Sequence, residues 1–184
     1  MPSTISKSQA LQFRLFFTII VSSMLGGLLL WQFNHGGIPS HHLLADKSLP
    51  KISNAWGALV IPIVTWILLW LTQRRVFGPA PSIQFPPQVA LSFLSALVFG
   101  LCLGLSIAYD FKAFSGNVPA ILFVLALLFP VYRAEYFLGF ILGLTYFIGG
   151  VLPVMVGFVF LLLAAAVHLL LRPLLLKLVA LVKS

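Results

Sequence analysis

Long apolar runs that contain almost no charge constrain this chain more than any other feature. Six such runs follow one another, and the whole sequence is 61% hydrophobic and only 8% charged. A soluble domain with this composition would expose large apolar patches to water. Helices in a bilayer satisfy their own backbone hydrogen bonds while lipid covers their side chains. The sequence therefore predicts an all-α, polytopic transmembrane helix bundle in a single domain, residues 1–184.

The six runs differ in length, and the differences predict how each run meets the bilayer. We place the spans at about 11–33, 55–72, 87–109, 118–132, 136–148 and 153–171. At roughly 1.5 Å per residue, all but the fourth and fifth can cross a hydrocarbon core of about 30 Å. Those two require local thinning of the bilayer, or they form a partly re-entrant hairpin sheltered by the other helices. A five-span alternative joins the fifth and sixth runs into one bent helix.

The distribution of Lys and Arg over the loops predicts the orientation. With six spans and the amino terminus inside, the inner face holds eight of the eleven basic residues: Lys7, Arg14, Arg74, Arg75, Arg133, Arg172, Lys177 and Lys183. The other three, Lys47, Lys51 and Lys112, lie outside. We expect both termini to lie in the cytoplasm. We also expect the chain to be a multi-pass protein of a bacterial inner (plasma) membrane. Because the basic residues flank apolar runs, we expect the lipid bilayer as partner and no nucleic acid.

Small residues recur four positions apart on three of the predicted helices. The glycines concerned are Gly26, Gly27, Gly100, Gly104, Gly139 and Gly143. Lipid tails are as apolar as leucine, so membrane helices associate through close packing, which small residues permit. We expect these glycines to pack helices within the bundle. Association with a second copy, or with a larger membrane complex, is the alternative.

The outer loop, residues 34–54, holds most of the histidines. Those histidines and one acid are His35, His41, His42 and Asp46. If Ser40 caps a short helix, His42 and Asp46 share one face at i and i+4, whereas His41 points away. Imidazole and carboxylate suit a divalent transition metal such as Zn, Ni or Cu. We therefore predict a metal site at His35, His42 and Asp46, to which Asp110 could add a carboxylate.

Two alternatives remain for this loop. It could be an amphipathic interfacial segment whose histidines face water, or it could have a proton-sensing or catalytic role. The run from His35, with His-Leu-Leu-Ala beginning seven residues later, resembles the first-helix histidine motif of small nickel/cobalt permeases. That resemblance implies metal transport. However, Pro39 and His41 stand where the family has a glycine and an aspartate, and we do not assign the chain to it.

A second polar cluster is predicted at the inner end of the bundle. His168 and Arg172 lie at i and i+4 on the last span, and Arg133 and Glu135 lie between the fourth and fifth spans. Ionisable groups at this depth are functional candidates, and we predict binding of an anionic lipid headgroup by Arg133, His168 and Arg172. The alternative is structural: Arg172 reaches the phosphates and His168 bonds a neighbouring helix.

Three function classes follow from these features. The short, Gly/Pro-interrupted fourth and fifth helices favour a transport-like protein, and the paucity of polar groups elsewhere favours an accessory subunit. A membrane-embedded enzyme or metal-binding protein that uses the outer histidines is the alternative, and the sequence does not decide whether the chain is an enzyme.

The inner loop, residues 77–87, contains four prolines and is expected to be a stiff spacer.

Overall fold

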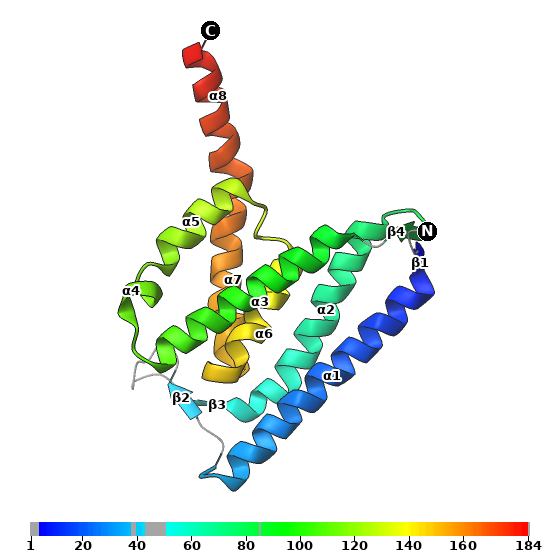
Figure 1. Ribbon diagram of the computed structural model, residues 1–184, viewed down its shortest axis with the longest axis vertical. Coiled ribbons are helices and arrows are strands. Elements are labelled where there is room, and N and C mark those ends of the chain that lie inside the picture. Colours follow the sequence, from blue (N-terminus) through cyan, green and yellow to red (C-terminus); the bar gives the residue numbers. More distant parts are fainter. Residues whose placement is uncertain (1–3, 38–39, 43–50, 85, 184) are drawn as a thin grey trace.

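Helices make up most of the computed structural model, which describes residues 4–37, 40–42, 51–84 and 86–183 (Figure 1). The α-helices are α1 (Lys7–Asn34), α2 (Gly57–Phe77), α3 (Pro87–Ala108), α4 (Lys112–Ser115), α5 (Val118–Leu128), α6 (Ala134–Ile148), α7 (Val151–Ala166) and α8 (Arg172–Lys183). A 3-10 turn, η2 (Asn54–Trp56), precedes α2, and a π-helical turn, η3 (Val167–Leu171), joins α7 to α8.

Two short antiparallel strand pairs lie between helices. Strand β1 (Thr4–Ser6) pairs with β4 (Ser82–Gln84), and β2 (Ser40–His42) pairs with β3 (Lys51–Ser53). The second pair corrects one expectation: residues 40–42 are extended rather than a helical turn capped by Ser40, because their backbone pairs with β3. Strand β4 agrees with the extended backbone expected for the proline-rich loop 77–87.

Four helical stretches in the described part of the chain are long and apolar enough to cross a membrane. They are Lys7–Asn34, Asn54–Phe77, Pro87–Ala108 and Val151–Leu178. Helices α5 and α6 are shorter, with 11 and 15 residues, as the lengths of the fourth and fifth apolar runs predicted. The last stretch is a correction, because the helix runs on beyond residue 171 through η3 and α8.

The short helix α6 forms the buried centre of the bundle. Its side chains Leu138, Ile141 and Leu144 are each only 1% exposed. Helix α3 lies along one side of it, and α2 and α7 pack against others (Figure 1). A helix too short to cross a bilayer alone is thus surrounded by longer ones, which is how such a helix can be accommodated at membrane depth.

Glycines bring α3 and α6 into backbone contact. A Cβ atom at Gly100 would lie 2.5 Å from the carbonyl oxygen of Phe140 on α6. Cβ atoms at Gly139 and Gly143 would overlap backbone oxygens of α3, and one at Gly104 would overlap the ring of Phe147. Only residues without a side chain allow this approach.

The two glycines of α1 have different surroundings. A Cβ atom at Gly26 or Gly27 would meet no described atom within 4 Å. Helix α1 packs against α2 and the core through other positions, such as Leu25, so these glycines make no close helix contact within the described chain.

A sharp turn separates α6 from α7. Gly149 has a φ of +83°, a conformation that favours glycine, and Gly150 packs against Gly57, where an added Cβ would lie 3.0 Å from the Gly150 Cα atom. The two helices on either side pack against each other rather than forming one bent helix. The fifth and sixth apolar runs therefore form two separate helices, α6 and α7.

Candidate functional site

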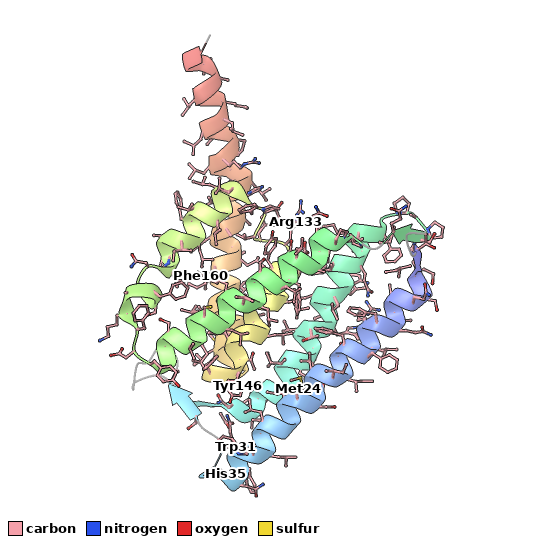
Figure 2. All side chains as sticks on the ribbon, in the orientation of Figure 1. Met24, Trp31, His35, Arg133, Tyr146 and Phe160 are labelled. Atoms are coloured by element: carbon pink, nitrogen blue, oxygen red, sulfur yellow. The ribbon has the colours of Figure 1, made fainter. Side chains whose placement is uncertain are left out.

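Strand β1 and the start of α8 lie toward the same end of the bundle (Figure 1). Strand β4 and the connection between α5 and α6 lie at this same end, which we call the terminal end. The strands β2 and β3 and the α6–α7 turn lie toward the opposite end. Arg133 lies at the terminal end, where α8 leaves the bundle (Figure 2).

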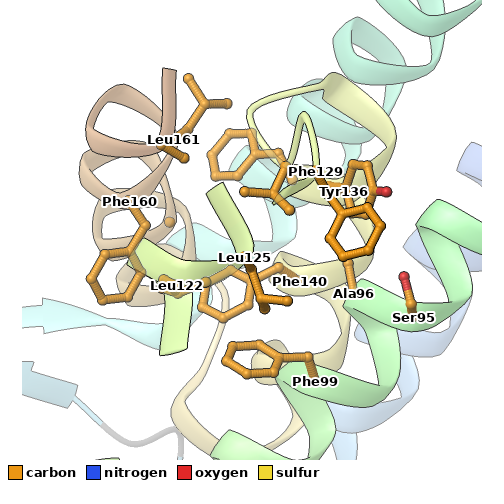
Figure 3. Close-up of a pocket in the computed structure, with 14 residues that line it drawn as sticks. Ser95, Ala96, Phe99, Leu122, Leu125, Phe129, Tyr136, Phe140, Phe160 and Leu161 are labelled. Atoms are coloured by element: carbon orange, nitrogen blue, oxygen red, sulfur yellow. The ribbon is translucent and has the colours of Figure 1, made fainter. Parts of the chain in front are cut away.

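An aromatic cavity of about 320 Å³ lies between α3, α5, α6 and α7 (Figure 3). Its aromatic lining consists of Phe99, Phe129, Tyr136, Phe137, Phe140 and Phe160. The space exists because Ala96, Gly157 and Ala164 stand where larger side chains would fill it. With this lining, the cavity suits an apolar group such as a hydrocarbon tail.

His168 ties the last helix to α5 beside this cavity. Its Nδ1 atom lies 2.7 Å from the carbonyl oxygen of Ala126, and because a carbonyl can only accept, Nδ1 carries the proton and donates. In a continuing helix the N–H of residue 130 would donate to that carbonyl, but residue 130 is Pro130 and has no N–H. The histidine therefore satisfies a backbone acceptor that the sequence of α5 leaves open.

The two arginines predicted to join His168 reach this neighbourhood from different elements. The ring of Tyr132 lies 5.5 Å from the His168 ring, which brings the loop that carries Arg133 against η3. Arg133 is half-buried at the start of α6, between the cavity-lining residues Val131 and Tyr136. Arg172 follows His168 by one helical turn and is exposed. The fold thus brings the segments that carry these three residues close to residues that line the aromatic cavity.

A buried ion pair joins α2 to α6 at the terminal end. Arg75 donates to the carboxylate of Glu135 over 2.5 Å, and the carboxylate side chain is 4% exposed against 39% for the guanidinium. The second carboxylate oxygen of Glu135 has no hydrogen-bond partner among the described residues. The sequence places Glu135 in the inner cluster but does not reveal this pairing. A lone acid among basic residues is the only signal, and it does not identify the partner.

The outer metal prediction rests largely on residues that lie outside the described part of the chain. Asp46 lies there entirely, and the side chain of His42 is not described either. His35 stacks on Trp31 with ring centroids 4.8 Å apart, and its Nδ1 atom lies 2.9 Å from the Trp31 carbonyl oxygen (Figure 2). Asp110, the possible fourth ligand, forms an exposed ion pair in which its Oδ2 atom lies 3.5 Å from the Nζ atom of Lys112.

Among the described residues, no group of three His, Cys, Asp or Glu side chains could hold a metal. The helical face that would have aligned His42 with Asp46 is lost, because residues 40–42 form β2. The site stays a prediction, which Zn²⁺ binding by His42→Ala compared with His41→Ala would test.

A second apolar space, of about 730 Å³, lies between α1 and the α3–α6 pair. We call it the lateral groove. Phe17, Met24 and Trp31 line it from α1, and Phe93 and Tyr146 line it from α3 and α6. The α3–α6 pair is therefore the wall between the lateral groove and the aromatic cavity.

Comparison of the chain with protein-family models, with curated proteins and with solved structures finds no match in any of the three.

Proposed function

We propose that this chain is a multi-pass protein of a bacterial inner membrane that binds an amphiphile with an anionic headgroup from the cytoplasmic leaflet. In this proposal six segments cross or enter the bilayer, and both termini are cytoplasmic. The role is transport-like, or that of an accessory subunit that presents or retains such a molecule. The observation that carries the proposal is the aromatic cavity with basic residues on the segments beside it.

The division of the site suits the two parts of an amphiphile. The cavity offers apolar surface to a tail, and transfer of a tail from water or from loosely packed lipid into a close-fitting aromatic space is favourable. Arg133 offers a planar donor group that suits a phosphate or carboxylate. Arg172 is a further donor for an anionic headgroup, and the Nε2 atom of His168, which has a free lone pair while Nδ1 carries the proton, can accept from a headgroup hydroxyl.

The distribution of charge supports the proposed orientation. The terminal end carries the segments that contain most of the basic residues, including the Arg74-Arg75 pair and α8. Positive residues favour the cytoplasmic side of an inner membrane, where anionic lipids also attract them. A headgroup site at this end would therefore face the leaflet from which an anionic amphiphile is drawn.

Cysteine labelling tests the orientation. In a Cys102→Ser background, a Lys183→Cys variant should react with a membrane-impermeant thiol reagent only after the membrane is opened. A Lys112→Cys variant should react in intact cells, because α4 follows the end of α3 that lies away from the terminal end. Labelling of Lys183→Cys from outside would refute the six-segment topology.

Ligand binding is tested on the purified full-length protein in mild detergent. We expect phosphatidylglycerol to raise the unfolding temperature and to remain bound in native mass spectrometry, whereas phosphatidylcholine should do neither. Glycerol phosphate, which lacks the tails, separates headgroup recognition from whole-lipid binding. If phosphatidylglycerol and phosphatidylcholine bind equally, the proposal fails.

Matched variants locate the binding. Ala96→Phe fills the aromatic cavity and should abolish binding, whereas Ala120→Phe makes the same change on an exposed face of α5 and should not. Arg133→Gln should weaken binding about tenfold, the loss expected for one charge-assisted hydrogen bond. Arg74→Gln removes an exposed charge at the same end and is the control. Equal losses in Arg133→Gln and Arg74→Gln would show that only general charge matters.

A further inference from the structure

Helix α8 leaves the bundle with leucines exposed along its length (Figure 1). Leu174, Leu175, Leu176 and Leu178 are between 42% and 58% exposed. Exposed leucines on successive turns form an apolar surface that water does not tolerate well. Something outside the described chain must cover this surface in the folded protein.

The charges of α8 indicate what covers it. The helix contains Arg172, Lys177 and Lys183 and no acid. At about 100° per residue, Leu174, Leu178 and Leu181 share one face, and Arg172 lies roughly 120° to 180° away from them. Lys177 lies at the margin of the apolar face, where a long side chain can extend its charge outward. An apolar face on a helix whose only charges are positive is typical of a helix that lies in an anionic membrane surface.

The junction with α7 allows the required change of direction. The turn η3 is π-helical, and Pro173 removes a backbone donor at the second position of α8. Prolines and π-turns are the usual places where a long helix bends. The hydrogen bond from His168 to Ala126 holds the helix to α5 just before this point, so a bend would move α8 and leave α7 in place.

We propose that α8 folds at η3 and Pro173 onto the inner leaflet and binds anionic phospholipid with Lys177. Leu174 and Leu178 then lie at the boundary between headgroups and acyl chains. The contact orients the carboxy-terminal end of the protein on the membrane and makes its position depend on lipid charge. This proposal rests on the proposed membrane location and cytoplasmic carboxy terminus, and it does not depend on ligand binding in the aromatic cavity.

The experiment places an environment-sensitive fluorophore on Leu178→Cys in the full-length Cys102→Ser protein. The protein is reconstituted in vesicles of phosphatidylcholine alone or mixed with phosphatidylglycerol. We expect a blue-shifted emission and protection from aqueous acrylamide, a neutral quencher that the vesicle charge does not repel, only in the mixed vesicles. Added salt should weaken both effects, because it screens the attraction between lysine and phosphate.

Charge variants test whether Lys177 of α8 makes the contact with the lipid phosphates. Lys177→Glu should strongly reduce the protection, and Lys112→Glu, the same charge reversal outside α8, should leave it intact. Three results overturn the proposal: a fluorophore exposed in both vesicle types, protection that ignores lipid charge, or efficient cross-linking of two copies through Leu178→Cys. If Ala96→Phe still binds phosphatidylglycerol and the α8 protection is retained, the cavity site alone is contradicted and the α8 contact stands.

Discussion

The contact between α3 and α6 yields the most quantitative prediction. We consider Gly100→Ala, which adds a single methyl group at the closest approach of the two helices. The new Cβ atom would lie 2.5 Å from the carbonyl oxygen of Phe140, whereas ordinary contact begins at about 3.4 Å. The helices must therefore separate by about 0.9 Å at this point. Backbone atoms of Gly143 and Leu144 also lie within 3.3 Å, so no side-chain rotation can relieve the overlap.

The energetic cost follows from this separation. A gap of about 0.5–1 Å forfeits a quarter to a half of the dispersion energy of each contact that it opens. Overpacking usually costs about 1–3 kcal/mol, and we take the upper end because the obstacles are backbone atoms. Alanine favours a helix over glycine by about 1 kcal/mol, which offsets part of the loss. The net destabilisation is about 2 kcal/mol, or about 4–8 °C in the unfolding temperature of a chain this size.

Thermal unfolding in detergent measures this change against two matched variants. Gly27→Ala adds the same methyl group on α1, where nothing described lies within 4 Å, and should leave the unfolding temperature unchanged or slightly raised. Gly104→Ala meets only the ring of Phe147, which can rotate, and should cost less than Gly100→Ala. If Gly100→Ala proves as stable as Gly27→Ala, the backbones of the two helices are not in contact at Gly100.

Two further predictions concern polar contacts between helices. Arg75→Gln should destabilise the protein by about 3 kcal/mol, because it leaves the buried carboxylate of Glu135 unpaired. Glu135→Gln should cost only about 1 kcal/mol, because the half-exposed arginine can reach water. Thermal unfolding measures both variants, and a larger loss for Glu135→Gln than for Arg75→Gln would contradict this reasoning. His168→Phe should cost about 1–3 kcal/mol by leaving a backbone carbonyl of α5 without a donor. In the double variant, Pro130→Ala should restore part of the stability lost in His168→Phe, because residue 130 then has an N–H for the Ala126 carbonyl. If the effects of the two substitutions on the free energy of unfolding simply add, the hydrogen bond from His168 to Ala126 is contradicted.

Several properties of the chain can be read from sequence because they depend on local pattern. Apolar runs locate the long helices, since a segment in lipid needs apolar side chains over its whole length. The pair Gly149-Gly150 marks the break between α6 and α7, because a backbone with positive φ favours glycine wherever it occurs. Both signals act over one turn or one helix and need no knowledge of neighbours.

The candidate site was predicted only in part. Sequence spacing places His168 one turn before Arg172, and it raises the choice between headgroup binding and a bond to a neighbouring helix. The acceptor for His168 depends on Pro130, about 40 residues earlier, and on the packing of α5 against η3. The aromatic cavity is built from four helices, so no single stretch of sequence reveals it.

The sequence by itself determined the helical, apolar character of this protein, its six apolar runs and the position of its small residues. Tertiary structure alone decided what those residues meet. Gly27 and Gly100 occupy similar small-residue patterns, yet one lies on an open surface and the other against the backbone of α6. Likewise, Glu135 pairs with Arg75, 60 positions away. The physical reason is that spacing along a helix shows which side chains share a face, whereas the helix that covers this face is set by packing of the whole bundle.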